Sequence, residues 1–383
     1  MTSRPRVALD VETSRLYGRG ILKGISQYLI SSRPWSIYIE QHEIGGDVTR
    51  LLSRWSGDGI ITRQLTEDSK KTILGRGMAV IDLSNFTPSM GIPRICSADS
   101  ACGRAGAQHF IERGFKHFAC CHYRGQHWSQ QRADGFVAEV EFTKHECRVY
   151  EQPFRVQAQK WDQDQERLAE WLVSLPRPVG VLATNDLLGH HVLDACGRAN
   201  LMVPEEVAVL GVDNDELLCN LTNPPMSSII LDPERIGFVA AKRLDQIMQG
   251  EENGAIENET TEIPSLGVAV RQSTDIFAVP DPEIARALRY IRDHACEGAT
   301  VQDVLDHMSV SRSWLERGFR EHFGRSPKAE IRNVQIARCK ELLKMTDLSL
   351  ENIAGLAGFK HSEYMGVMFK RETGLSPGKY RNS

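Results

Sequence analysis

Near residue 278 the apolar residues of this chain change their spacing. Before that point, short apolar runs alternate with amphipathic stretches, as in RVALDV (6–11) followed by GILKGISQYLI (20–30). Repeated strand–helix–strand units predict a parallel sheet with helices on both faces. After that point, apolar residues recur only with helical spacing. The sequence therefore predicts an α/β part followed by an all-α part.

The α/β pattern runs through two successive halves, which predicts two lobes that each contain a parallel sheet. The predicted strands lie at 6–11, 35–41, 57–62, 78–84, 115–121, 148–154, 178–186 and 206–215. The predicted helices lie at 20–30, 105–114, 132–142, 161–175 and 189–200. Two strands end in polar residues, namely Asn185, Asp186, Asp213 and Asn214. Because small ligands bind at the carboxyl ends of strands in open parallel sheets, we expect a ligand site there.

The boundary between the two parts is expected near residue 278. A polar segment from Gly250 to Asn258 precedes a last short strand, and VPDPE (279–283) then supplies two prolines that stop regular structure. We therefore expect a ligand-binding domain over 1–278 and a helical domain over 279–383. The helical tail from residue 281 onward carries 17 Lys and Arg against 14 Asp and Glu, a net charge of +3, while the rest carries −7. This asymmetry suits a nucleic-acid-binding tail, but an ordinary solvated surface explains it about equally well.

Two helix-turn-helix units are predicted in the tail. In VQDVLDHMSVSRSWLERGFREHFG (301–324), a helix ending near His307 is followed by a short turn and by Ser311, an N-cap residue that opens a second helix. The pattern recurs in LENIAGLAGFKHSEYMGVMFKRETG (350–374), where Gly358 ends the first of two helices. This spacing is typical of DNA-binding helix-turn-helix motifs.

One long helix is predicted over AEIRNVQIARCKELLKM (329–345), ahead of the second unit, whose second helix is expected over 361–372. A rigid linker of this kind fixes the two units relative to one another. Recognition helices in successive major grooves on one face of DNA lie about 34 to 36 Å apart. One tail is therefore expected to read a long asymmetric site.

The tail resembles the DNA-binding domain of AraC-type regulators over nearly all of residues 284–381. The resemblance rests on SRSWLERGFREHFGRSP in the first unit and on LSLENIAGLAGFKHSEYMGVMFKRETGLSPGKYR in the second. Gln335 and Cys339 stand where Arg and Ala are usual, and Val367 replaces a common Arg. These departures concern individual contacts rather than the fold.

This resemblance implies that two recognition helices enter neighbouring grooves of double-stranded DNA. The residues implied to face DNA are Ser311, Arg312, Ser313, Trp314 and Arg317 in the first helix, and His361, Ser362, Glu363 and Tyr364 in the second. Arg and Ser donate to base edges or phosphates, and Glu accepts from cytosine. For Trp314, Tyr364 and Phe369, packing in the protein core is the alternative.

The first part resembles the effector domain of LacI-type repressors and the periplasmic sugar-binding proteins, without the leading DNA-binding unit of LacI-type chains. Combined with an AraC-type tail, it resembles the xylose-operon activators of enteric bacteria through stretches such as WSGDGIIT, RADGF, WDQDQERLAEWLVSLP and GVDNDE. The resemblance implies a small sugar, D-xylose, as the effector. The residues implied to bind it are Tyr17, Arg19, Arg132, Trp161, Asn185 and Asp213, with Trp128 as a second candidate for stacking. Arg, Asn and Asp offer hydrogen bonds to hydroxyls, and Trp stacks on the apolar face of a sugar ring.

Three of these residues have a structural alternative. Trp161 is also suited to capping or stapling its own helix. Asp213 is also suited to a turn within VDND, and Arg132 to an ion pair with Asp134 or Glu139 of its own helix. We expect Ala at Arg132 or at Asp213 to abolish the sugar response and to leave the fold intact.

The sequence lacks the motifs of an enzyme or a nucleotide site. GRGILKG (18–24) and GRAGAQ (103–108) match neither the dinucleotide-binding nor the P-loop pattern. His190 and His191 do not share a helix face, and no GxSxG elbow is present. No catalytic residue, metal or cofactor is therefore predicted. Since the N-terminus carries no secretory signal and no stretch reaches transmembrane length, we expect a cytoplasmic protein without a membrane partner.

The sequence as a whole predicts a sugar-responsive DNA-binding transcription regulator that activates pentose catabolic genes. Because LacI-like lobes usually self-associate, the resemblance implies a homodimer whose tails bind repeated sites and recruit RNA polymerase. Sugar binding is expected to close the two lobes. The alternatives are a repressor, a regulator of this architecture for another sugar, a solute-binding protein and a sugar-modifying enzyme. The last two leave residues 284–381 unexplained.

Overall fold

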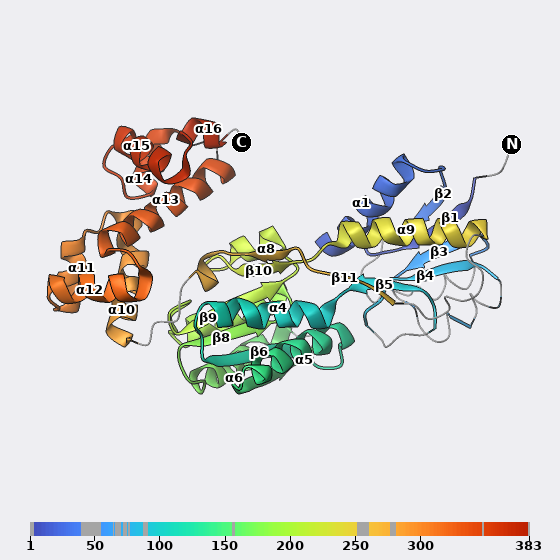
Figure 1. Ribbon diagram of the computed structural model, residues 1–383, viewed down its shortest axis with the longest axis horizontal. Helices are drawn as coiled ribbons and strands as arrows, with labels where there is room; N and C mark the ends of the chain where they lie inside the picture. The colour runs from blue at the N-terminus through green and yellow to red at the C-terminus, as the bar shows by residue number, and fades with distance from the viewer. Residues whose placement is uncertain are drawn as a thin grey trace. The chain divides into compact units, whose positions relative to one another are not determined.

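The computed structural model (Figure 1) divides the chain into two compact units, Met1–Asp275 and Ile276–Ser383. The residues it describes are 4–39, 55–63, 65, 70–71, 75, 77–86, 91–154, 158–250, 260–275, 281–346 and 348–381. The boundary predicted near residue 278 lies outside these described residues. Within them, no helix combines the length and apolar character needed to cross a membrane.

The first unit contains two sheets, as the sequence predicts, and in the described residues each sheet has six strands. The first sheet has the spatial order β11 (Thr260–Ile263), β5 (Arg94–Ser97), β4 (Ala79–Asp82), β3 (Gly59–Thr62), β1 (Arg6–Asp10) and β2 (Ser36–Ile39), and its paired strands are parallel. The second sheet has the order β12 (Gly267–Ala269), β10 (Ser227–Ile230), β9 (Val207–Val212), β8 (Val179–Ala183), β6 (His117–Tyr123) and β7 (Cys147–Gln152). In the second sheet β12 is antiparallel to β10 and the other pairs are parallel. The predicted α/β fold with parallel sheets is confirmed.

Helices pack on both sheets (Figure 1). Those associated with the first sheet are α1 (Leu16–Ile30) and α9 (Pro233–Gln249). Those associated with the second are α4 (Asp99–Glu112), α5 (His127–Phe142), α6 (Trp161–Val173), α7 (Asp186–Arg198) and α8 (Glu216–Leu221). The lobes are not simply successive halves of the sequence, because α9 and β11 return to the first sheet after β10 has completed most of the second.

The central strands explain why the sequence reads as continuous apolar runs. All residues of β3, β4, β8 and β9 are buried, which is the pattern of parallel strands that helices cover on both faces. Glycines allow the covering helices to pack closely. A Cβ at Gly24 of α1 would lie 1.9 Å from the Glu234 carbonyl oxygen of α9, and one at Gly103 of α4 would lie 1.9 Å from the Arg132 carbonyl oxygen of α5. These glycines of GRGILKG and GRAGAQ therefore serve helix packing.

The described residues of the second unit form helices. The first helix-turn-helix unit contains α11 (Val301–Met308) and α12 (Arg312–Phe323), preceded by α10 (Pro282–His294) and the short helix η3 (Ala295–Glu297). The second contains α14 (Leu350–Leu356) and α15 (Ser362–Thr373), followed by α16 (Pro377–Arg381). The long helix α13 (Pro327–Met345) links them, as predicted. The N-cap role predicted for Ser311 is also confirmed, because its Oγ accepts a hydrogen bond from the Trp314 N–H at 3.2 Å.

Gln335 of α13 joins the two helix-turn-helix units. Its side chain is buried, and its amide nitrogen donates to the carbonyl oxygens of Ala295 in η3, just before the first helix-turn-helix unit, and of Gly358 in the turn of the second, both at 3.0 Å. Gly358 has a left-handed φ of 76°, and a Cβ there would lie 2.4 Å from the Ala295 carbonyl oxygen. Close backbone contact and a shared amide therefore fix the two units relative to one another.

Candidate functional site

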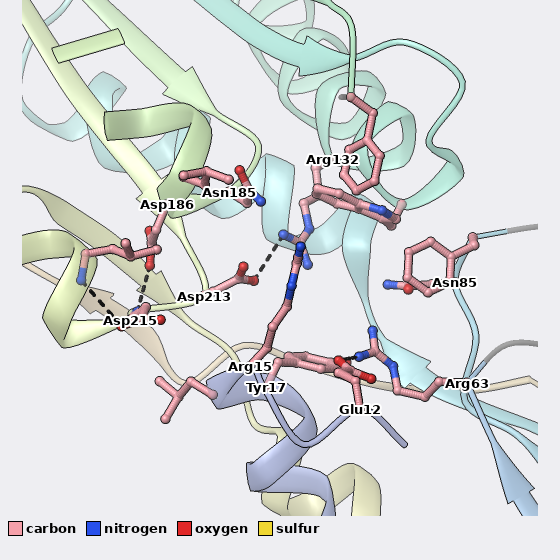
Figure 2. A pocket seen from close by; sticks show the side chains of 16 residues that line it. Glu12, Arg15, Tyr17, Arg63, Asn85, Arg132, Asn185, Asp186, Asp213 and Asp215 are labelled. Atoms are coloured by element: carbon pink, nitrogen blue, oxygen red, sulfur yellow. Dashed lines mark hydrogen bonds and ion pairs between the residues drawn. The ribbon is translucent and has the colours of Figure 1, made fainter. Parts of the chain in front are cut away.

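A cavity of about 220 Å³ lies in the first unit, among loops and helix starts of both lobes. Its lining residues are Glu12, Arg15, Leu16, Tyr17, Arg63, Asn85, Phe86, Trp128, Arg132, Phe154, Asn185, Asp186, Leu187, Asp213, Asp215 and Leu218. Figure 2 shows side chains of the first lobe, such as Tyr17 and Arg63, and of the second, such as Asn185 and Asp213, around a common space. The cavity is smaller than a typical site for a drug-sized ligand, and its lining is rich in hydrogen-bonding groups.

Arg132 of α5 holds several parts of the cavity together. Its Nε donates to the Asp99 carboxylate at 2.8 Å, and one terminal nitrogen donates to the Thr184 carbonyl at 2.8 Å and to the Asp213 carboxylate at 3.3 Å. Asp99, the first residue of α4, also accepts from the Asn85 amide at 2.7 Å. Burial opposes the charge of Arg132, but the carboxylates of Asp99 and Asp213 outweigh it and raise the Arg132 pKa. The guanidinium therefore remains charged although it is buried.

The burial of this pair changes what Arg132→Ala can test. Arg132 is 3% exposed and Asp99 is 1% exposed, so Ala at Arg132 leaves a buried carboxylate without its main partner. Breaking a buried ion pair in this way costs about 3–5 kcal/mol. We therefore expect an intact fold for Ala at Asp213, whose side chain is about one-third exposed, rather than for Ala at Arg132.

Asp186 and Asp213 are carboxylates on the second-lobe side of the cavity. Asp186 opens α7 directly after its N-cap residue Asn185, and it accepts hydrogen bonds from the Ser228 hydroxyl at 2.6 Å and the Asp215 N–H at 2.7 Å. Burial, followed by the nearby Asp213 charge, raises the pKa of Asp186 to about 8. The two carboxyl groups therefore have different roles. Asp186 holds the loop that contains Asp215 through a hydrogen bond, whereas Asp213 faces Arg132 (Figure 2).

Asn185 has one side-chain atom committed to the fold. Its Oδ1 accepts from the Leu188 N–H at 2.9 Å and caps α7. Because this bond uses the oxygen, the amide nitrogen remains as a donor at the cavity. A donor of this kind suits a hydroxyl or carbonyl oxygen of a ligand.

The first-lobe wall combines a buried ion pair with aromatic rings. Arg63 pairs with Glu12, and its guanidinium lies 4.6 Å from the centroid of the Tyr17 ring and 5.6 Å from that of Phe86. The Tyr17 hydroxyl lies 2.8 Å from the Ser97 hydroxyl. Glu12 Oε2 and Arg63 Nε are buried without a hydrogen-bond partner among the described residues. Buried polar atoms of this kind favour a polar partner from the adjoining cavity.

Five of the seven predicted sugar-binding residues meet at this cavity: Tyr17, Trp128, Arg132, Asn185 and Asp213. Arg19 is exposed, and its Nε donates to the Thr13 carbonyl at 2.7 Å. Residues two positions apart face different sides of a helix, which explains why Tyr17 reaches the cavity and Arg19 does not. Trp161 opens α6 and packs its ring 4.7 Å from the His191 ring, outside the cavity lining.

The structural alternatives for the predicted residues have different outcomes. Arg132 pairs with Asp99 and Asp213 rather than with Asp134 or Glu139 of its own helix. Asp213 lies in a turn with a φ of 112°, as its structural alternative predicts, and also faces Arg132, while its role in sugar binding stays a prediction.

Sequence reasoning missed several lining residues of the first lobe. Glu12 follows β1 by two residues, Arg63 directly follows β3, and Asn85 lies three residues beyond β4. The carboxyl ends of these strands carry the same signal that pointed to Asn185 and Asp213 in the second lobe. Applied to both lobes, that signal identifies these three residues.

The predicted DNA-facing residues lie at the starts of α12 and α15. Those that are exposed are Arg312, Ser313, Arg317, His361, Glu363 and Tyr364, together with the N-cap residue Ser311; Trp314 and Ser362 are half-buried. The opposite faces of the two helices are core, with Leu315 and Phe319 on α12 and Met365 and Phe369 on α15. The packing alternative is therefore confirmed for Phe369.

Tyr364 is 49% exposed and is held by Arg332 of α13. A terminal nitrogen of Arg332 donates to the Tyr364 hydroxyl at 3.0 Å, and the guanidinium lies 4.9 Å from the Tyr364 ring centroid and 5.2 Å from that of Phe359.

Among the described residues, no cluster of three or more His, Cys, Asp or Glu is arranged to hold a metal ion.

Two families match parts of the chain. Residues 107–274 match the periplasmic binding protein-like domain, and residues 304–383 match a helix-turn-helix domain. Over 98% of its length the chain is 32% identical to the xylose operon regulatory protein of Haemophilus influenzae, covering 98% of that protein. Over its whole length it is 30% identical to the xylose operon regulatory protein of Escherichia coli strain K12, covering 98% of that protein.

A solved structure also matches the whole chain. The structure of the xylose-binding transcription activator xylR superposes with a TM-score of 0.81 at 29% identity, covering 100% of this chain and 98% of that one. Both units of the chain thus have counterparts in one known protein.

The pH dependence of stability tests the environment of Asp186. Because burial raises its pKa from 3.8 to about 8, the folded chain holds a proton that the unfolded chain has lost between these values. The stabilisation is complete below about pH 4 and is lost as the pH rises through about 8. Relative to Asp186→Asn, we expect the free energy of unfolding to fall across this window by at most about 1.4 kcal/mol per pH unit. Urea unfolding of both proteins measures this, and parallel pH profiles would contradict it.

Proposed function

The chain belongs to the family of xylose operon regulatory proteins, and on that basis we propose that it binds D-xylose in the cavity of its first unit and activates transcription through its tail. It is a sugar-responsive, DNA-binding transcription regulator rather than an enzyme. The observation that carries the proposal is the match of both units, along nearly the full length, to regulators named for the xylose operon. Neither a solute-binding protein nor a sugar-modifying enzyme accounts for the helix-turn-helix unit.

The chemistry of the cavity suits a neutral polyhydroxyl ligand. Its lining includes three guanidinium groups, from Arg15, Arg63 and Arg132, and four carboxyl groups, from Glu12, Asp186, Asp213 and Asp215. The lining thus offers both donors and acceptors, as vicinal hydroxyls require. A sugar phosphate would need a surplus of positive charge that this lining does not offer. The ligand is therefore a free sugar.

Trp128 and Phe154 add apolar surface to the same cavity. The Trp128 ring is mostly buried, and the Arg132 guanidinium lies over it, 4.9 Å from the ring centroid. Aromatic rings of this kind bind the apolar face of a sugar ring. Polar groups on both lobes and an aromatic ring on one would hold the sugar between them.

Sugar binding acts through the difference in affinity between two states of the first unit. A sugar that bonds to Tyr17 and Arg63 in one lobe and to Asn185 and Asp213 in the other binds more tightly when the lobes are close together. Closed lobes are therefore favoured by the ligand, and this change is the signal passed to the tail.

The remaining parts of the proposal concern partners and location. A homodimer would place two tails on repeated DNA sites, where they recruit RNA polymerase in the cytoplasm. A chain that sediments as a monomer with D-xylose and with DNA would contradict the dimer.

Calorimetric titration with D-xylose tests the sugar site. We expect saturable binding of D-xylose in preference to L-arabinose, ribose and glucose. Asp213→Asn removes a charged acceptor at the cavity and should weaken D-xylose binding about ten- to hundredfold. Thermal melting of the variant checks that its fold is retained.

Asp215→Asn is the matched control. Asp215 also lines the cavity, but its carboxylate accepts from the backbone N–H groups of Leu217 and Leu218 and caps α8. Because Asn caps helices about as well as Asp, this variant should change the affinity no more than about threefold. Equal losses in both variants, or no binding of any of the four sugars, would overturn the assignment of the site.

Substitution of Arg317 tests the DNA-binding surface. Arg317 is exposed on α12, and we expect Arg317→Ala to weaken binding to an operator selected from random duplexes. If Arg317 contacts a base, the variant should lose about 1–3 kcal/mol of discrimination at one base pair. If it contacts a phosphate, the slope of log affinity against log salt concentration should become smaller by about 0.9. Fluorescence anisotropy titrations at several salt concentrations distinguish the two.

Arg286→Ala is the control within the same unit. Arg286 is also an exposed arginine, but it lies on α10 and pairs with Glu283. Its removal should leave both the affinity and the salt slope nearly unchanged. An Arg317 variant that behaves like the Arg286 variant would remove α12 from the interface.

A further inference from the structure

The turn that follows β9 has one residue facing the cavity and the next facing away from it. Asp213 lines the cavity and pairs with Arg132, whereas the Oδ1 of Asn214 accepts from an Arg271 terminal nitrogen at 2.9 Å. Both turn residues have left-handed backbones, with φ of 112° and 52°. Asp and Asn adopt such conformations more readily than other non-glycine residues, and the hydrogen bonds of the turn hold them there. The turn is therefore a place where a change at Asp213 also moves Asn214.

Hydrogen bonds hold this turn on its β10 side. The Asp213 N–H donates to the Ile229 carbonyl at 3.1 Å, and the Asn214 N–H donates to the Ser228 hydroxyl at 2.9 Å. The same Ser228 hydroxyl donates to the Asp186 carboxyl in the cavity lining. Occupancy of the cavity can therefore act on the turn from two carboxyl groups.

Arg271 connects this turn to the last segment of the first unit. A second terminal nitrogen of Arg271 donates to the Met226 carbonyl at 3.1 Å. Its backbone N–H donates to the Ser227 hydroxyl at 2.8 Å, and that hydroxyl donates to the Arg271 carbonyl at 2.9 Å. The Arg271 side chain thus contacts the turn that follows β9, while the Arg271 backbone is bonded to β10.

The residues after Arg271 are anchored just as firmly. The Ser273 hydroxyl donates to the Val209 carbonyl at 2.6 Å, and the Thr274 hydroxyl donates to the Ser227 hydroxyl at 2.8 Å. Arg113, which caps the C-terminal end of α4, donates through its Nε to the Thr274 carbonyl at 3.1 Å. The first unit ends at Asp275, and the second unit follows in the chain. Residues 271–275 are therefore the exit segment, through which a change in the first unit is passed along the backbone.

We propose that the hydrogen bond between Asn214 and Arg271 couples sugar occupancy to the exit segment, residues 271–275. A sugar hydroxyl that bonds to Asp213 competes with Arg132 for that carboxylate and shifts the turn, and Asn214 then carries the shift to Arg271. Arg271 acts as a positioning residue and does not touch the sugar. This inference rests on the proposed function, and it names how the sugar site regulates the tail.

The test compares three variants of the full chain. Asn214→Gly removes the acceptor and suits the left-handed backbone, and Arg271→Met removes the donors but keeps the aliphatic stem. Arg113→Met is the matched control, because Arg113 anchors the same segment but does not bond to the cavity turn. Melting temperatures establish that each variant folds.

Two measurements are made on each protein. The first is the ratio of operator affinities with and without D-xylose, on an operator selected from random duplexes with the sugar-bound wild-type chain. The second is hydrogen–deuterium exchange of peptides covering residues 271–275, with and without D-xylose, which requires no DNA. D-xylose affinity is measured by calorimetry in parallel.

We expect the wild-type chain and Arg113→Met to show a sugar-dependent ratio and a sugar-dependent change in exchange. In Asn214→Gly and Arg271→Met the ratio should fall close to one and the exchange should become independent of sugar, while the D-xylose Kd stays within about threefold. A fourth protein that carries both Asn214→Gly and Arg271→Met should lose no more coupling than either single variant, as expected for two residues acting through one bond.

Three results would overturn the coupling. One is a full ratio in Arg271→Met, and another is an equal loss in Arg113→Met, since any loosening of the exit segment would then suffice. The third is a D-xylose affinity lost tenfold or more in Arg271→Met, which would place Arg271 in the binding site itself. A wild-type chain that binds no D-xylose contradicts the proposed function instead. A wild-type chain that binds D-xylose without changing DNA affinity still leaves the exchange experiment to decide on the coupling.

Discussion

The buried guanidinium of Arg132 is the interaction on which the first unit is built. It joins α5 to the start of α4 through Asp99, to the end of β8 through Thr184, and to the turn after β9 through Asp213. An isolated charge at this depth would be very unfavourable, so each partner is required by the others. Asp99 is fully committed within the protein, whereas Asp213 remains partly exposed. The same network that stabilises the second lobe therefore leaves one carboxylate available for a ligand.

In the tail, a buried neutral side chain rather than a charged one joins separate segments of the chain. Gln335 stands where AraC-type tails usually carry Arg, and its amide donates to the Ala295 carbonyl in η3, ahead of the first helix-turn-helix unit, and to the Gly358 carbonyl in the second. A neutral amide satisfies both carbonyls at a buried position and avoids the cost of desolvating a guanidinium. Gly358 permits the close backbone approach that brings these carbonyls together. Gln335 thus links the two parts of the tail through a neutral side chain.

Sequence reasoning succeeded where a local pattern determines the outcome. Alternating apolar runs predicted the parallel sheets, and the N-cap at Ser311 and the helix over 329–345 were predicted from adjacent residues. It did not find the return of α9 and β11 to the first sheet, because strand order depends on contacts between distant segments. Arg19 and Trp161 show the same limit at the level of single side chains. Their residue types suit a sugar, but helix phase turns Arg19 away and α7 provides His191 as a partner for Trp161.

After α9, the chain crosses from the first sheet to the second shortly before it leaves the first unit. β11 pairs with β5 in the first sheet, and β12, only a few residues later, pairs with β10 in the second. The crossover between Ile263 and Gly267 is therefore one place where a change in the angle between the lobes is absorbed, and only β12 and Val270 separate it from the exit segment. The segment is bonded to strands of the second sheet, so it follows that lobe, while β11 follows the other. Relative motion of the lobes is therefore taken up in the crossover between β11 and β12, while Arg271 and the turn after β9 stay together on the second lobe.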